Sequence, residues 1–177
     1  MKSDKNIFDV LFSRSSYRGK YKDSPVPRED LELIIKAGIA APSGCNRQTP
    51  VFVAIDDKDK ISSIRKAFPR PSTQTAPAFI IVFTQKIVGI DGYYYNVEDY
   101  AAAIENMLLT IKALGYESCW YQGGVRACAD EFRALVKLPE QYSFVCLLPV
   151  GIAEDEVSMQ LDKKIFSERA WFNEYKI

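Results

Sequence analysis

Two arginines with hydroxyl side chains between them stand out near the N-terminus. The segment is Arg14-Ser15-Ser16-Tyr17-Arg18, and residues 13–22 carry four basic side chains and no acidic one. Guanidinium groups form bidentate hydrogen bonds with phosphate oxygens, so this segment has the chemistry of an anion receptor. A solvated basic loop explains the same five residues, and on these residues alone it is the better explanation.

A second candidate segment, residues 41–50, combines turn-forming residues with amide side chains. It reads Ala-Pro-Ser-Gly-Cys-Asn-Arg-Gln-Thr-Pro. Asn46 and Gln48 each offer both a donor and an acceptor, which suits recognition of the edge of a heteroaromatic ring. A turn after a helix accounts for Pro42, Gly44 and Pro50, but it accounts less well for the two amides.

A third candidate segment, residues 118–124, ends in the pair Gly123-Gly124. Paired glycines let a backbone approach a ligand closely and expose its N–H groups. For two glycines alone, a tight turn is the simpler explanation.

The composition excludes several kinds of chemistry. The chain has no histidine, so Ser-His-Asp and Cys-His catalysis and histidine-ligated metal sites are absent. Its four cysteines form no CxxC pair, which gives no support to a zinc or thioredoxin-like site and favours free thiols. Neither GxGxxG nor GxxxxGK[ST] occurs, so a dinucleotide-binding or P-loop unit is not indicated. Basic and acidic residues number 23 each, which argues against general binding to nucleic acids or anionic membranes.

Hydrophobic periodicity and turn residues predict the elements that position these segments. We expect a first helix at residues 7–12 capped by Ser3 or Asp4, and further helices at 27–41, 57–68, 97–114 and 129–136. We expect four buried strands, at residues 51–55, 78–83, 118–121 and 144–150. This alternation predicts an α/β or α+β fold in three layers, with helices on both faces of a sheet.

The helix expected at residues 97–114 has an apolar face too wide for a simple surface helix. It is either a central core helix or one that buries a second face against another subunit. The tail from residue 154 carries Phe166, Trp171, Phe172 and Tyr175, which we expect to pack on something, such as a partner chain.

A chain of 177 residues is expected to form one domain, spanning residues 1–177. No apolar run approaches the length of about 20 residues that a membrane span needs, and no targeting segment is visible. We therefore expect a cytoplasmic protein.

Taken in order, the three segments resemble the nitroreductase-like family of FMN oxidoreductases. Residues 99–109 and 113–120, which read Asp-Tyr-Ala-Ala-Ala-Ile-Glu-Asn-Met-Leu-Leu and Ala-Leu-Gly-Tyr-Glu-Ser-Cys-Trp, complete the pattern. The family pattern has Arg-x-Ser-x-Arg after the first helix, then Pro-Ser-x-x-Asn-x-Gln, then a long helix leading to Leu-Gly-x-x-Ser-x-Trp and Gly-Gly. The resemblance extends from about Phe8 to the C-terminus. The chain departs from the family at residues 69–73, Pro-Arg-Pro-Ser-Thr, where members often place Asn or Lys.

The resemblance implies a three-layer α+β fold whose central sheet is mixed but mostly antiparallel. It also implies a homodimer with FMN at the subunit interface and a C-terminal segment exchanged with the partner. The residues that would hold FMN are Arg14, Ser15, Ser16, Arg18, Pro42, Ser43, Gly44, Asn46, Gln48, Gln122, Gly123, Lys163 and Lys164.

Each group of these residues has an implied role. The segment containing Arg14 and Arg18 would hold the phosphate and ribityl chain and place positive charge by the pyrimidine edge. Residues 42–48 would approach from the partner subunit. Gln122 and Gly123 would present backbone N–H groups near flavin N5, and the basic pair at 163–164 would help to bind the phosphate.

The implied activity is ping-pong transfer of hydride from NAD(P)H to the flavin and then to an electron-poor acceptor such as a nitroaromatic or quinone. No catalytic acid or base from the protein is expected, since the cofactor carries the chemistry. We expect Tyr93, Tyr94 and Tyr95 to form a pocket wall or lid. Two alternatives stay open: an FMN enzyme of the same fold that performs dehydrogenation, dehalogenation or flavin cleavage, and a binding protein without cofactor.

Overall fold

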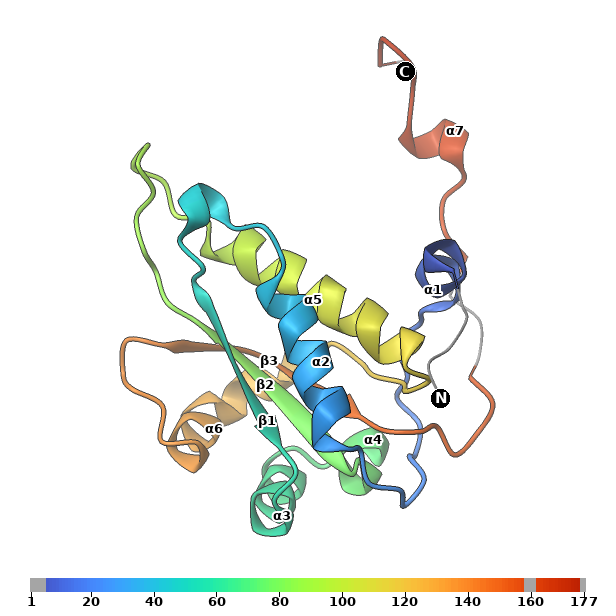
Figure 1. The fold of residues 1–177 in the computed structure, drawn as a ribbon, viewed down its shortest axis with the longest axis vertical. Helices are drawn as coiled ribbons and strands as arrows, with labels where there is room; N and C mark the ends of the chain where they lie inside the picture. Colours follow the sequence, from blue (N-terminus) through green and yellow to red (C-terminus); the bar gives the residue numbers. More distant parts are fainter. Residues whose placement is uncertain (1–5, 158–161, 176–177) are drawn as a thin grey trace.

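The computed structural model describes residues 6–157 and 162–175 (Figure 1). Among them the helices are α1 (Ile7–Ser13), α2 (Arg28–Ile39), α3 (Lys58–Ala67), α4 (Pro71–Thr75), α5 (Asn96–Ala113), α6 (Ala129–Leu135) and α7 (Phe166–Arg169), with two short 3₁₀ turns, η1 (Gly44–Asn46) and η2 (Gly124–Cys128). The strands are β1 (Pro50–Ile55), β2 (Ala78–Thr84) and β3 (Ser143–Val150).

The three strands form one sheet in the order β1-β2-β3, and both pairs are antiparallel. Pro50 lies opposite Thr84 and Ala78 lies opposite Val150, with a register shift between Val82 and Phe83. The predominance of antiparallel pairing is as expected, although no parallel pair occurs among the described strands.

The prediction of a fourth strand at residues 118–121 is wrong. Among the described residues, this segment forms one isolated bridge to β3, from Tyr121 to Leu147, and Glu117 just before it forms another with Gly151 just after β3. Between the bridges, the carbonyl of Ser118 accepts a hydrogen bond from the N–H of Tyr17 at 2.8 Å. The backbone of this apolar run therefore forms a hydrogen bond with the segment after α1, and it does not form a continuous ladder with β3.

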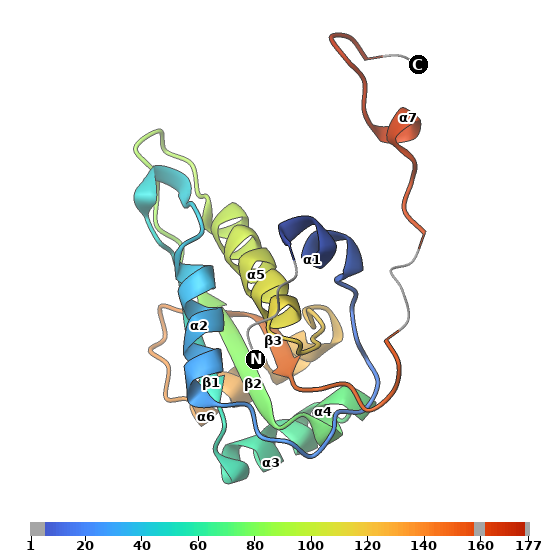
Figure 2. The ribbon, with the colours of Figure 1, turned by 45° about the vertical axis from the view of Figure 1, so that its right-hand side comes forward.

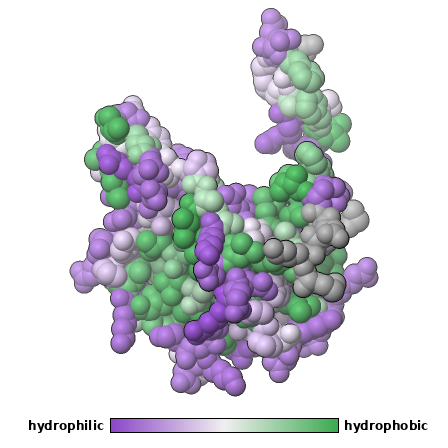
Figure 3. Space-filling model, viewed as in Figure 1, coloured by the Kyte–Doolittle hydropathy of each residue, from purple (hydrophilic) through white to green (hydrophobic). Residues whose placement is uncertain are grey.

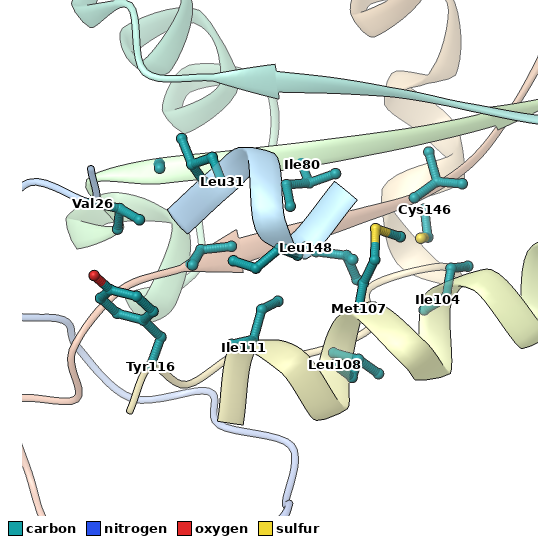
Figure 4. Close-up of a cluster of buried hydrophobic side chains, with 14 of the residues drawn as sticks. Val26, Leu31, Ile80, Ile104, Met107, Leu108, Ile111, Tyr116, Cys146 and Leu148 are labelled. Atoms are coloured by element: carbon teal, nitrogen blue, oxygen red, sulfur yellow. The ribbon is translucent and has the colours of Figure 1, made fainter. Parts of the chain in front are cut away.

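Strand β2 separates two hydrophobic clusters, because successive side chains point to opposite faces of a sheet. Ile80 and Val82 join the cluster under α2 and α5, shown in Figure 4, whereas Phe79, Ile81 and Phe83 join the cluster under α3 and α6. All seven residues of β2 are buried. The expected three-layer arrangement, with helices on both faces of the sheet, is confirmed.

Strand β1 is less buried than we expected. Its residues are half-exposed apart from Ile55, because it forms one edge of the sheet and no described strand pairs with its outer side. An open edge of this kind presents unpaired backbone N–H and C=O groups to a further strand.

Helix α5 ends as predicted, with Gly115 just beyond it at φ 88°. Met107 and Ile111 on one face are buried in the core, whereas Ala102 and Leu109 on other faces are only half-buried. The wide apolar face is thus only partly covered within one chain.

Helix α1 is capped by Asn6, and not by Ser3 or Asp4, which lie outside the described residues. The Asn6 Oδ1 accepts hydrogen bonds from the N–H groups of Phe8 at 2.8 Å and Asp9 at 3.1 Å, as an N-cap does. Apart from the buried Val10, the apolar side chains of this helix are exposed, and Figure 3 shows hydrophobic surface in the region of α1. The exposed ones are Ile7, Phe8, Leu11 and Phe12.

The C-terminal segment that carries α7 projects away from the body of the chain (Figures 1 and 2). Its rings pack in pairs, Phe166 with Phe172 and Trp171 with Tyr175, at centroid distances of 5.7 and 4.3 Å. No described helix is both long and apolar enough to cross a bilayer.

Candidate functional site

The first and third candidate segments meet in the structure. Besides the bond from Tyr17 to Ser118, the Ser16 side chain hydrogen-bonds to the Cys119 thiol. Burial raises the pKa of Cys119, while Ser16 and the nearby charges of Arg18 and Arg14 act in the opposite direction. The two arginines therefore lie close to the start of residues 118–124.

Arg14 and Ser15 are half-buried, whereas Ser16 and Arg18 are exposed. The Arg14 guanidinium also forms an ion pair with Glu105 of α5, at 3.3 Å between Nε and Oε1. This pair attaches the basic segment to the long helix.

Beside this junction lies a hollow of about 460 Å³. It is lined by Arg18, Phe68, Arg70, Pro71, Tyr121 and Gly124. It brings a basic residue of the first segment together with two residues of the third and with the turn that precedes α4.

The walls of this hollow are aromatic and cationic. Phe68 and Tyr121 meet edge to face at 5.3 Å between centroids, and the Arg70 guanidinium lies 5.1 Å from the Phe68 centroid. Tyr121 Oη is hydrogen-bonded to Ser72 Oγ at 2.8 Å, while burial raises the pKa of Tyr121. In the described part of the chain, neither Arg18 nor Arg70 forms an ion pair with a carboxylate. Such a hollow suits a planar molecule that carries negative charge.

Sequence reasoning missed Arg70 and Tyr121 as site residues. Arg70 was noticed only as a departure from the family pattern. Pro71 at the first position of a helix signals α4, but the hollow itself depends on contacts with residues about 50 positions away.

Gln122 and Gly123 follow directly after this wall. Gln122 is half-buried and lines a second hollow of about 420 Å³, which also contains Arg126 and Arg133. Gly123 is exposed, and a Cβ built on it would meet no atom within 4 Å. Its backbone is thus open to an approaching molecule.

The second candidate segment, residues 42–48, folds around η1. The Gly44 N–H donates to the Asp99 carboxylate at 2.7 Å, and the Gln48 N–H donates to Ser43 Oγ at 3.1 Å. The amide of Gln48 donates to Asn46 Oδ1 at 3.2 Å, so the two predicted ring-reading side chains lie together. Three residues of this loop have a positive φ, between 48° and 52°: Cys45, Asn46 and Gln48.

One chain does not bring residues 42–48 to the basic segment. Gly44 is bound at the first turn of α5, whereas Tyr17 is bound to Ser118, beyond the other end of that helix. At about 1.5 Å of rise per residue, these anchors are on the order of 20 Å apart along the helix axis. Figures 1 and 2 show the η1 loop and the segment after α1 on different sides of the molecule.

Lys163 and Lys164 are exposed on the projecting C-terminal segment. No contact joins them to the basic segment in the described part of the chain. Their implied role in holding a phosphate stays a prediction.

The tyrosine-rich loop borders residues 42–48. Tyr93 and Tyr94 are exposed, while Tyr95 donates a hydrogen bond to the Asp91 carboxylate. That bond raises the pKa of Tyr95 to about 12 and lowers the pKa of Asp91. The role of the three tyrosines as a wall or lid stays a prediction.

The arrangement can bind an anion and a flat ring. All four cysteines are free, and only Cys45 is exposed. Among the described residues, no group of three or more Cys, Asp or Glu side chains is placed to hold a metal ion.

Known proteins of similar sequence were found by comparison with this chain. Residues 11–70 and 64–152 match the family model described as "Nitroreductase family". A protein of Archaeoglobus fulgidus with the provisional name NADH dehydrogenase/NAD(P)H nitroreductase is 31% identical over 151 residues, covering 83% of this chain and 85% of that protein. The FMN reductase [NAD(P)H] of Bacillus subtilis is 25% identical over 167 residues, covering 83% and 67% of the two chains.

A crystal structure from Bacteroides thetaiotaomicron, under the same provisional name as the archaeal protein, superposes with a TM-score of 0.80. It is 27% identical and covers 96% of this chain and 98% of its own. The matches therefore confirm the resemblance and the fold expected from the ordered motifs: this chain belongs to the nitroreductase family.

Proposed function

We propose that this protein oxidises NAD(P)H through bound FMN and passes the electrons, in a ping-pong sequence, to electron-poor acceptors such as nitroaromatics or quinones. That it is an NAD(P)H-dependent oxidoreductase with FMN as cofactor follows from its family and from relatives such as the FMN reductase. The acceptor class and the order of the steps are the proposed part. The observation that carries the proposal is the hollow where Arg18 and Arg70 face aromatic walls beside the open backbone of Gly123.

The residues present fit this cofactor. The hollow offers two guanidiniums, from Arg18 and Arg70, without carboxylate partners in the described structure. A guanidinium without a carboxylate favours an anionic ligand that can accept its hydrogen bonds. When bound, FMN would supply the redox chemistry, accepting hydride at N5 and donating it to the acceptor.

The protein would act by binding and by electrostatics. Arg14 and Arg18, with Ser15 and Ser16 between them, would hold the phosphate and ribityl chain, since Arg forms bidentate bonds with phosphate. Positive charge from Arg70 would lie at the ring and favour the electron-rich, reduced cofactor. The N–H groups of residues 122–123 would orient the ring edge.

A homodimer would complete the site. Because one chain holds residues 42–48 far from the basic segment, a second copy is needed to bring them to the same cofactor. The apolar face of α1 and the half-buried face of α5 are surfaces that a second copy would cover. The open edge of β1 could accept the partner's C-terminal segment as an added strand.

The test is spectroscopic. The purified protein, loaded with FMN, should show a flavin absorption spectrum that bleaches with NAD(P)H in the absence of oxygen. The colour should return when a nitroaromatic or a quinone is added. A protein that takes up no FMN would overturn the whole proposal.

The same experiment separates the alternatives. Bleaching that neither acceptor reverses would favour dehydrogenation, dehalogenation or flavin cleavage, each of which can then be assayed directly. The single domain over residues 1–177 and the cytoplasmic location stay predictions.

A further inference from the structure

Asp99 is a buried carboxylate without a cationic partner in the described part of the chain. Asp99 lies in the first turn of α5, and the residue is only 2% exposed. One oxygen accepts the Gly44 N–H at 2.7 Å, and the other accepts the Thr49 hydroxyl at 2.7 Å. A helix N-terminus favours negative charge, which makes this carboxylate tolerable inside the protein.

These two hydrogen bonds fix both sides of one loop. Gly44 begins η1, and Thr49 immediately precedes β1, so Asp99 holds the loop of residues 44–49 at its beginning and its end. The backbone N–H of Asp99 also donates to the carbonyl of Tyr95 at 2.9 Å, which connects the tyrosine-rich loop to the same turn.

The loop needs such support because its backbone is unfavourable. Cys45, Asn46 and Gln48 all have positive φ, a region that residues with side chains enter at a cost in free energy. Conformations of this kind persist where surrounding contacts hold them. The carboxylate of Asp99 supplies two charge-assisted hydrogen bonds, which are stronger than bonds between neutral groups.

We propose that Asp99 is a positioning residue for the cofactor: it holds residues 44–49 in the shape in which Asn46 and Gln48 meet the FMN of the partner subunit. This inference rests on the proposed function. In this role Asp99 acts through the loop that it holds.

The test uses four variants of the full chain. Asp99→Asn replaces one oxygen by an NH₂ group, which cannot accept the hydrogen bond that the carboxylate accepted there. Thr49→Val removes one of the two bonds, while Thr49→Ser keeps the hydroxyl. Glu98→Gln is the matched control, because Glu98 lies in the same helical turn but is exposed.

The first measurement is amide hydrogen exchange of the protein without FMN. Peptides covering residues 42–49 should exchange at least tenfold faster in Asp99→Asn and Thr49→Val, and at the wild-type rate in Thr49→Ser and Glu98→Gln. Unchanged exchange in both Asp99→Asn and Thr49→Val would overturn the proposal. If Asp99→Asn does not fold, the comparison of Thr49→Val with Thr49→Ser decides alone.

The second measurement is FMN affinity, by quenching of flavin fluorescence, with the circular dichroism of the bound flavin. We expect Asp99→Asn to bind FMN about tenfold more weakly with an altered flavin spectrum, and Glu98→Gln to match the wild type. Equal affinity and equal spectra in Asp99→Asn would overturn the positioning role. Wild-type protein that binds no FMN would instead overturn the proposed function, and with it the cofactor that this role requires.

Discussion

The side chain of Tyr95 lies against Gly44, at a place where even an added methyl group would overlap the tyrosine Cβ and ring. The loop of residues 42–48 and the tyrosine-rich loop are therefore packed on each other, although 50 residues of sequence separate the two contacting positions. The resemblance gave Gly44 a role in approaching the flavin. In the structure, Gly44 has a second role within its own chain, because a larger residue at this position would overlap Tyr95.

Gly44→Ala should destabilise this contact. Forcing a methyl group into a packed position costs about 1–3 kcal/mol, which corresponds to roughly a 5- to 150-fold change in an equilibrium. We expect a lower midpoint of thermal unfolding and weaker FMN binding. The double variant Gly44→Ala/Tyr95→Gly should lose less than the sum of the single changes, since it removes the overlapping groups. Strict additivity would show that the two residues do not interact.

Arg70→Gln should weaken FMN binding without unfolding the protein. Hydrogen bonds to charged groups contribute about 1.5–3 kcal/mol, so the dissociation constant should rise about 10- to 150-fold. Lys66→Gln is the control, because Lys66 carries the same charge near the end of α3 but is not part of the hollow. Titration of FMN at two salt concentrations measures the dissociation constant of each variant. If Arg70→Gln and Lys66→Gln lose FMN affinity equally, the net charge of the protein sets the affinity and the position of Arg70 in the hollow does not.

The contact between Tyr95 and Asp91 should set a pH window for the tyrosine-rich loop. The bond lowers the pKa of Asp91, so its contribution is complete above the ordinary carboxylate range and is lost as the pH falls through the lowered value. It raises the pKa of Tyr95 to about 12, so on the alkaline side the contribution is complete below the ordinary tyrosine value and is lost as the pH rises through about 12. The contact is therefore present at neutral pH.

Asp91→Asn tests this window, because it removes the carboxylate and lets the pKa of Tyr95 return toward 10. Absorbance at the tyrosinate band should show more ionised tyrosine in the variant than in the wild type near pH 11. Asp23→Asn, at an exposed position elsewhere, should leave the titration unchanged. Identical curves for the wild type and Asp91→Asn would contradict the contact.

Phe8→Glu tests whether α1 lies at a subunit interface. The Phe8 side chain is 63% exposed in one chain, so a charge there should not unfold a monomer. Within a buried interface the same charge would be strongly unfavourable. We expect sedimentation to show a dimer for the wild type and mostly monomer for the variant, with FMN binding reduced at least tenfold. Leu33→Glu on α2, which is also partly exposed, shows whether the effect is specific to α1. A variant that stays dimeric would exclude α1 from the interface.

Local signals in the sequence were sufficient for most of the fold. Apolar spacing and end signals located α2, α3, α5 and α6, and the β-branched runs located β1, β2 and β3. They were not sufficient at residues 118–121, where an apolar run forms a single isolated bridge to β3, at Tyr121. An apolar run predicts burial, but it does not predict which backbone groups its own N–H and C=O groups will bond.

The candidate site was predicted from the order of its motifs, and the residues of the hollow that this prediction missed are those brought there by distant contacts. Arg18 was proposed because it lies near Arg14 in a basic segment, whereas Arg70 joins it only through folding. In the sequence, Asp99 appeared only as the first residue of the motif at residues 99–109, with no role assigned to its side chain. Its bonds to Gly44 and Thr49 join positions 55 and 50 residues apart, which no local pattern reveals.

Strand β2 has a consequence for how the molecule unfolds. Because all seven of its residues are buried and alternate between the two hydrophobic clusters, neither helical layer can open fully without exposing the strand that the other layer needs. The two layers should therefore behave as one cooperative unit, with a single unfolding transition. The slowest amide exchange in the chain should come from β2, while the exposed tyrosine-rich loop exchanges through local openings that leave this unit intact.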